Sequence, residues 1–188
     1  MAGLESIEWV VLLSGPVAVG KTTLRDALVG AHGFGSVRSS EYLRQKAAGL
    51  SFIDDRLSLQ ELGDKLDFDT DYRWLVDDVA IPLFRSGDQQ RWLVDAVRKE
   101  RQVQHFKAAL PGKVLHVHLS APDHVLRTRF ALRLGASESD AEEAYIRTVS
   151  HPNEQASRAL IEVADLVVDT SEDQKHSLSR VIAMLMAA

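Results

Sequence analysis

Short apolar runs alternate with longer segments of helical period along this chain. The runs that predict strands cover residues 9–14, 34–38, 92–95, 114–119 and 166–169; most are rich in Val and Leu, and the one at 34–38 is weak. Most of them lack polar alternation, which is typical of strands buried on both faces of a parallel sheet. Strands that alternate with helices predict an α/β fold.

Apolar residues spaced by three or four positions mark the helices. The first follows the 9–14 strand, and we expect Gly30 to end it. Another helix ends before Pro111, a third begins at Pro122, and the last covers 178–185. The longest apolar stripe runs over 72–83 and is interrupted near its end by a proline.

Two stretches, 41–90 and 135–161, carry little strand character and are mostly helical and charged. We interpret them as insertions that border a site. Within the first, the Asp-rich stretch 64–78 overlaps an amphipathic helix, so its carboxylates are expected to form a solvated face. Within the second, His151-Pro152-Asn153 predicts a junction of two helices with Asn153 as the N-cap.

Composition narrows the class of protein. A chain of 188 residues with 45% apolar and 26% charged residues fits one globular domain. Its net charge of −5 argues against a general nucleic-acid binder, and the absence of cysteine excludes disulfides and thiolate metal sites. The apolar run 7–13 is too short to span a bilayer and has no basic leader. We therefore expect a cytoplasmic protein, monomeric or homodimeric, without nucleic-acid or membrane partners.

Residues 15–22 read Gly-Pro-Val-Ala-Val-Gly-Lys-Thr and match the pattern G-x-x-x-x-G-K-[ST] between a strand and a helix. The glycines let backbone N–H groups close around phosphate oxygens, and Lys21 can reach the β- and γ-phosphates. Thr22 is the expected Mg²⁺ ligand. The motif predicts binding of ATP with Mg²⁺, through Gly15, Val17, Ala18, Val19, Gly20, Lys21, Thr22 and Thr23.

A second predicted Mg²⁺ ligand is Asp95, which closes the 92–95 strand. Open α/β sheets bind their ligands at the carboxyl ends of the strands, so this carboxylate is well placed. The alternative is that Asp95 caps the next helix. A GTP switch is disfavoured because the sequence contains no Asn-Lys-x-Asp tetrapeptide.

The segment Asp95-Ala-Val-Arg98, followed by Gln102, resembles the Asp-Gly-x-Pro-Arg-x-x-x-Gln segment of adenylate-kinase-like nucleoside monophosphate kinases. Ser39-Ser-Glu-Tyr-Leu-Arg44 resembles their Thr-Gly-x-x-Leu-Arg segment. The resemblance implies that Arg44 and Arg98 hold the phosphate of the acceptor, with Ser39 beside them. It also implies that Gln102 contacts the acceptor base. Arg98 and Gln102 are four residues apart, so on a helix they would share one face.

The helix over 125–133 resembles the one that enters the lid of these kinases. The resemblance implies that Arg129 packs on the donor base and that Arg133 touches the phosphoryl group in transfer. Either Arg147 or Arg158 could be a further lid arginine, and surface charge is the alternative for both. The predicted catalytic cations are Lys21, Arg98, Arg129 and Arg133.

The resemblance implies a three-layer P-loop fold: a five-stranded parallel sheet with helices on both faces, an acceptor-binding insertion over 41–90 and a short lid over 135–153. The sequence also departs from the family. Ser40 and Ala96 stand where the family often has Gly, and Val97 where Pro is frequent, so the acceptor need not be AMP. The pattern is closer to the branch with phage-type deoxynucleoside monophosphate kinases, dephospho-coenzyme A kinases and some phosphomevalonate kinases.

The sequence thus predicts a phosphotransferase that moves the γ-phosphoryl of Mg²⁺-ATP to a nucleoside or deoxynucleoside monophosphate. One alternative is a P-loop kinase of another small metabolite, in which Asp95 would activate a hydroxyl as base. Another is a regulatory protein that binds and slowly hydrolyses the nucleotide. His116 and His118 would share one strand face, but without a third ligand nearby we expect them to be structural.

Overall fold

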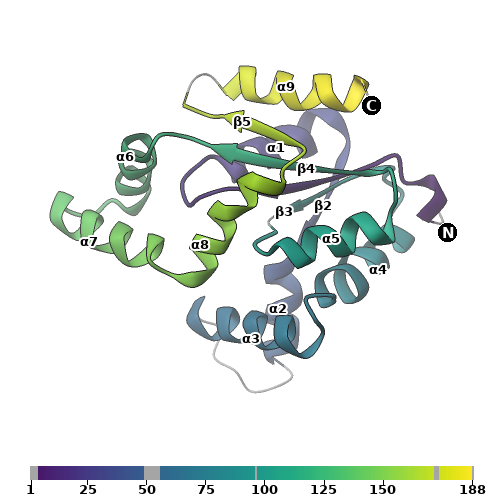
Figure 1. Cartoon of the computed structure of the whole chain (residues 1–188), viewed down its shortest axis with the longest axis horizontal. Helices are drawn as coiled ribbons and strands as arrows, with labels where there is room; N and C mark the ends of the chain where they lie inside the picture. The colour runs from purple at the N-terminus through teal and green to yellow at the C-terminus, as the bar shows by residue number, and fades with distance from the viewer. Residues whose placement is uncertain (1–3, 49–55, 96, 172–173, 188) are drawn as a thin grey trace.

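A parallel sheet of five strands, in the order β2-β3-β1-β4-β5, forms the centre of the computed structural model (Figure 1). The structure describes residues 4–48, 56–95, 97–171 and 174–187. The strands are β1 Trp9–Ser14, β2 Phe34–Arg38, β3 Arg91–Asp95, β4 Val114–Ser120 and β5 Leu166–Asp169. All five predicted strands are confirmed, each to within one residue at either end.

Helices connect the strands and cover both faces of the sheet. Those after β1 and β2 are α1 Lys21–His32, α2 Ser39–Ala48, α3 Arg56–Asp69, the π-helix η2 Leu75–Ala80 and α4 Ile81–Ser86. Those after β3 and β4 are α5 Glu100–Ala109, α6 Asp123–Leu134, α7 Glu138–Val149 and α8 Pro152–Ala159. The 3₁₀ helices are η1 Leu4–Ser6 and η3 Leu160–Val163, and α9 Gln174–Ala187 follows β5.

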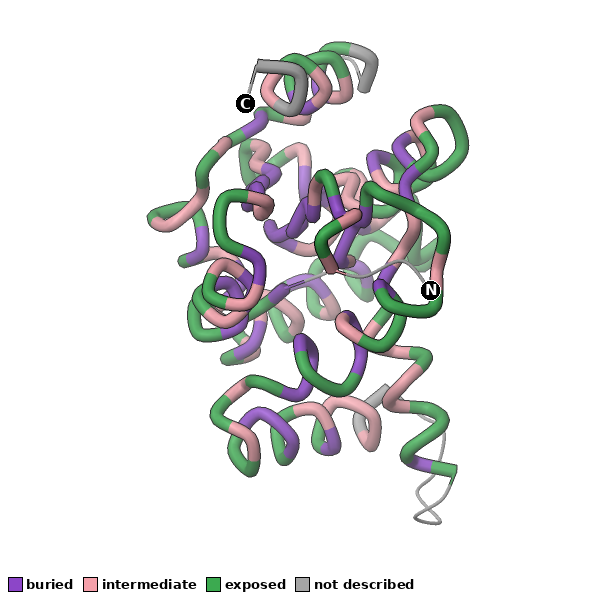
Figure 2. The backbone as a smooth tube through the Cα atoms, turned by 90° about the vertical axis from the view of Figure 1, so that its right-hand side faces the viewer, coloured by how far each residue is buried: buried purple, intermediate pink, exposed green. Residues whose placement is uncertain are grey.

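The two faces of the sheet build two apolar clusters. Val11 and Leu13 of β1 belong to the cluster formed with α1, α6 and α9, whereas Val10 and Leu12 belong to the cluster formed with η2, α4 and α5. All four side chains are fully buried, so β1 has no solvent-facing side. Figure 2 shows buried backbone gathered towards the centre of the molecule, with exposed stretches mostly on the outer helices and loops. This burial on both faces explains why the strand lacks polar alternation.

The stretches 41–90 and 135–161 are largely helical in their described parts, as expected, while residues 49–55 lie outside the described residues. The prediction that Gly30 ends the first helix is wrong. α1 continues to His32, and Gly33 ends it with φ +69° while donating its N–H to the carbonyl of Leu28. No helix in the described part of the chain has the length and apolar character needed to cross a membrane.

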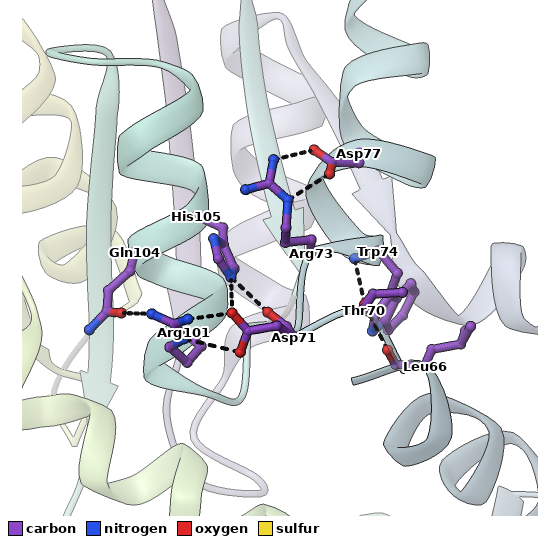
Figure 3. A network of polar contacts seen from close by, with 9 residues as sticks. All are labelled: Leu66, Thr70, Asp71, Arg73, Trp74, Asp77, Arg101, Gln104 and His105. Carbon is purple, nitrogen blue, oxygen red and sulfur yellow. Dashed lines mark hydrogen bonds and ion pairs between the residues drawn. The ribbon is translucent and has the colours of Figure 1, made fainter. Parts of the chain in front are cut away.

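A polar network fastens the helical insertion to α5 (Figure 3). Asp71 and Tyr72, which follow α3, both have positive φ, a conformation that costs most residues energy. The turn is held from α5, because Arg101 binds the Asp71 carboxylate and His105 Nε2 lies 2.7 Å from the Asp71 carbonyl oxygen. The hydrogen bond from Arg101 lowers the pKa of Asp71. The network therefore ties the insertion to the helix that follows β3.

The positions of Gly30 and Gly33 predict opposite effects of the same substitution. Gly30→Ala should raise the free energy of unfolding by about 0.5–1 kcal/mol, because a Cβ there meets nothing within 4 Å and alanine favours a helix interior. Gly33→Ala should lower it by about 1–2 kcal/mol, because φ is +69°. Urea unfolding of both variants measures the difference, and equal effects would contradict the observed end of α1.

Candidate active site

The carboxyl ends of three strands meet at one edge of the sheet. Asp95, the last residue of β3, pairs in register with Leu13 of β1 and with Arg38 of β2. A cavity of about 1050 Å³ opens at this edge, as expected for an open parallel sheet. It is lined by every predicted nucleotide-binding residue of the 15–23 loop and by Ser39, Asp95, Arg98, Arg129 and Arg133.

The loop over 15–20 has the backbone of an anion-binding turn. Gly15, Ala18 and Gly20 have φ values of +133°, +62° and +100°, and such left-handed residues turn successive N–H groups toward one concave side. Gly15 cannot be replaced without movement, because a Cβ there would lie 2.4 Å from the Leu119 carbonyl oxygen. α1 begins directly after the loop at Lys21, so the positive end of its dipole faces the same space.

Lys21 carries the central charge of the site. Its Nζ donates to the carbonyl oxygens of Gly15 at 2.5 Å and Pro16 at 2.8 Å. Burial lowers the pKa of Lys21 to about 8; Glu154 and then Asp95 oppose this shift, whereas Arg98 and Arg133 add to it. The ammonium is therefore a cation at neutral pH, with two guanidinium groups and two carboxylates close enough to affect it.

Asp95 and Thr22 supply oxygen atoms to the same cavity. Asp95 Oδ2 accepts a hydrogen bond from Arg25 at 2.9 Å, and both side chains are mostly buried. Mg²⁺ prefers oxygen ligands and keeps several waters, so one hydroxyl and one carboxylate fit as the protein's share of its coordination. Among the residues that the structure describes, no group of three or more His, Asp or Glu side chains could hold a metal alone.

The predicted lid arginines of α6 reach the cavity. Arg129 donates to the carbonyl oxygen of Thr170 at 2.6 Å, and the Arg133 guanidinium lies 5.5 Å from the centre of the Phe130 ring. Of the two alternatives for a further arginine, Arg147 lines the cavity, where it pairs with an exposed glutamate of its own helix. Arg158 binds Glu154 and Tyr145 and is not among the described residues that line the cavity.

Two of the predicted acceptor-binding residues lie elsewhere. Arg44 is exposed on α2 and is not among the described lining residues. Gln102 is buried, and its side-chain oxygen accepts from the backbone N–H groups of Arg98 and Lys99. Gln102 therefore caps the start of α5, and its amide oxygen is already engaged there. Ala96 lies outside the described residues.

The amide nitrogen of the Gln102 side chain also has a partner. Its amide donates to Asp67, which accepts from the Trp74 indole at 2.8 Å as well. Asp67 is only 7% exposed, and burial raises its pKa. The expectation of a uniformly solvated acidic face over 64–78 is therefore wrong at Asp67, because the tertiary fold supplies buried donors for this carboxylate.

α8 contributes residues that the sequence motifs did not predict. His151 is its N-cap, because the ring accepts from the Asn153 N–H at 3.1 Å. The prediction of Asn153 as N-cap is wrong; its side chain instead donates to Asp64 on α3 at 2.9 Å. Glu154 lines the cavity, and its Oε1 accepts from the Val17 N–H at 2.8 Å. No local motif marks Glu154, which reaches the loop only through the fold.

A series of buried hydrogen bonds lies next to the start of the 15–20 loop. Ser14 Oγ lies 2.7 Å from His116 Nε2 and 2.9 Å from His118 Nδ1, while His116 Nδ1 faces the Val163 carbonyl oxygen at 3.2 Å. One assignment satisfies all three contacts: His116 donates to Val163, Ser14 donates to His116, and His118 donates to Ser14. Both rings are then neutral, which fits a structural role.

The sequence matches no protein-family model and no curated protein. Solved structures do match over nearly the whole chain. A gluconokinase from Sinorhizobium meliloti has a TM-score of 0.53 and 14% identity over 96% of this chain and 93% of its own. A shikimate kinase from Bacteroides thetaiotaomicron has a TM-score of 0.56 and 13% identity over 95% of this chain and 98% of its own. These likenesses establish the fold as that of P-loop kinases.

The buried histidines predict a loss of stability in mild acid. The pKa of His118 is lowered to about 4, mainly by burial and further by electrostatic repulsion from His116 and Lys21. In the unfolded chain the same ring has a pKa of about 6.5. Unfolding therefore takes up a proton between these values, and stability falls as pH drops from about 6.5 toward 4, by up to about 1.4 kcal/mol per pH unit for this group. His118→Asn, which keeps a donor for Ser14, should flatten that slope in urea unfolding at pH 7 and pH 5. An unchanged slope would contradict the neutral ring.

Proposed function

We propose that this chain is a phosphotransferase that moves the γ-phosphoryl of Mg²⁺-ATP to a small anionic acceptor. One observation carries the proposal: the phosphate-binding loop and Arg98, which comes from the segment after β3, face the same cavity. Arg98 is close enough for its charge to lower the pKa of Lys21. An arginine in that position suits the anion of a second substrate, placed in line with the terminal phosphate.

Catalysis would rest on positioning and on charge neutralisation. Lys21 and the loop N–H groups would hold the β- and γ-phosphates, and Arg133 and Arg98 would face the oxygens of the group in transfer. Bound at Thr22 and Asp95, Mg²⁺ would neutralise charge that develops on the bridging oxygens. Residues of α6 and α7 line the cavity. These helices would enclose the substrates and limit transfer of the phosphoryl group to water.

A nucleoside or deoxynucleoside monophosphate is one candidate acceptor, supported by the arrangement of Arg98 and Ser39 in the cavity. The bond between the γ-phosphorus and its bridging oxygen would break, and an acceptor phosphate oxygen would take its place. No protein base is needed, because that oxygen is already ionised. Gln102 would not read the base, because its amide is used within the protein.

A hydroxylated metabolite acid is the second candidate, and the lining of the cavity favours it. Ser39, Ser40 and Gln60 bring hydroxyl and amide groups to the same cavity as Arg98, and such groups recognise sugar-like hydroxyls. A hydroxyl acceptor must lose a proton as its oxygen attacks, and Asp95 and Glu154 are the carboxylates among the described lining residues. Because a fold alone does not assign a substrate, the matched kinases do not decide between the candidates.

A screen of acceptors tests the proposal. ADP release from Mg²⁺-ATP is measured with ribo- and deoxynucleoside monophosphates in one panel and with small sugar acids and hydroxy acids in another. We expect release above the acceptor-free rate in one panel only. If no acceptor increases the rate of ADP release, the proposal is contradicted and a nucleotide-binding regulator is favoured.

Lys21→Ala should lower kcat by about 10²–10³-fold, because it removes a preorganised cation from the developing charge. Folding should be little affected, since within the described residues the hydrogen bonds of Lys21 Nζ go to carbonyl oxygens of its own loop, at Gly15 and Pro16. Initial rates and a thermal melt measure the two effects. Parallel losses of activity and of folded protein would contradict the assigned role.

Arg98→Ala should lower kcat/KM for the acceptor by about 10–150-fold, the value of a charge-assisted hydrogen bond of about 1.5–3 kcal/mol. The Kd for ATP should stay within about threefold of wild type. Arg85→Ala is the matched control, because Arg85 is exposed on α4 and is not among the described lining residues. A selective loss of ATP binding in Arg98→Ala would place this arginine on the donor instead.

A further inference from the structure

In this structure a carboxylate of the protein already binds the phosphate loop. Glu154 Oε1 accepts from the Val17 N–H at 2.8 Å and from Arg158 Nε at 3.2 Å. The Glu154 side chain is only 14% exposed and comes from α8, far from the loop in sequence. A backbone donor of the loop is thus paired with an anionic oxygen of the same chemical type as a phosphate oxygen.

The same carboxylate lies beside the loop lysine. Among neighbouring charges, Glu154 has the largest effect on Lys21, and it raises the pKa of this amine against the effect of burial. In a P-loop the lysine meets the β- and γ-phosphates. Lys21 itself is turned to the carbonyl oxygens of Gly15 and Pro16. The Val17 N–H and the loop lysine are therefore both paired within the protein, the first with an anion and the second with two carbonyl groups.

We infer that Glu154 competes with the terminal phosphate of a nucleoside triphosphate for the Val17 end of the loop, and thereby sets the preference between triphosphate and diphosphate. A γ-phosphate next to Lys21 would bring further negative charge into the space of a carboxylate, and like charges in a poorly hydrated site repel strongly. A diphosphate, bound deeper at the start of α1, leaves Glu154 on Val17. Loss of the γ-phosphoryl in transfer lets the carboxylate return. The inference rests on the proposed nucleotide site and not on any acceptor.

Displacing Glu154 needs a side-chain rotation and no movement of the helix. α8 is fastened independently of Glu154, because Ser157 Oγ donates to the Gly15 carbonyl oxygen at 3.1 Å and Asn153 donates to Asp64 at 2.9 Å. Arg158, one turn further along α8, already contacts the same carboxylate oxygen and can stay paired with it after the rotation. The carboxylate thus keeps a counter-charge when the phosphate takes its place.

Binding of ATP and ADP to Glu154→Gln tests the inference without any acceptor. Glutamine keeps an oxygen that can accept from Val17 but removes the charge, so it should compete less well. In titration calorimetry with Mg²⁺ present, we expect the Kd for ATP to fall by about tenfold or more and the Kd for ADP to change by less than about threefold. Glu154→Ala should shift ATP binding in the same direction, and thermal melts verify that both variants are folded.

Glu162→Gln is the matched control, because Glu162 is exposed on η3 and the same charge is removed without touching the loop. ATP binding that is unchanged or weaker in Glu154→Gln would overturn the inference, as would equal tightening of ATP and ADP. Failure of the proposed function would look different. If Glu154→Gln binds ATP selectively more tightly but no acceptor increases ADP release, the inference is upheld and the proposed transferase activity is contradicted. If no variant bound ATP or ADP, both the inference and the proposed function would be contradicted.

Discussion

The concentration of positive charge around a half-buried lysine is the constraint on which the site depends. Lys21, Arg98, Arg129 and Arg133 line one cavity next to the positive end of α1. Cations gathered in this way are costly unless anions balance them. The protein supplies Asp95, held by Arg25, and Glu154, which also binds the loop. The balance of charge is consistent with the proposed binding of anionic substrates, which could exchange with the protein's own carboxylates.

The parts that could be predicted from the sequence are those in which local chemistry determines the structure. The strands could be predicted because burial on both faces of the sheet requires an unbroken apolar run. In β1, for example, residues 10–13 pack alternately into the two apolar clusters. The loop was evident because close approach and left-handed backbone restrict which residues fit, as at Gly15, where the Leu119 carbonyl leaves no space for a Cβ. Since parallel strands end at one edge, the order of motifs along the chain also predicted that Asp95 and Arg98 would lie beside the loop.

The parts that could not be predicted depend on contacts between distant segments. Gln102 matched a ligand-binding position, yet Asp67, 35 residues earlier, and the start of α5 take both ends of its amide. Asn153 has the chemistry of an N-cap, but a neighbouring histidine takes that role and frees the amide for α3. Glu154 belongs to no motif and acquires its position only when α8 packs against the loop. In each case a polar side chain has several possible partners, and the fold, which the local sequence does not specify, selects among them.

The contacts of α8 also connect the two halves of the site. Ser157 and Glu154 bind the phosphate loop, whereas Asn153 binds α3, and His151 contacts Gln60 on the same insertion helix. A short helix fastened at both sides holds the donor loop and the insertion at a fixed separation. The proposed transfer between two substrates would need such a fixed separation, because small errors of alignment reduce the rate of transfer steeply. In the mechanism proposed here, the Glu154 side chain would respond to the donor while the backbone of α8 keeps the distance between the loop and the insertion.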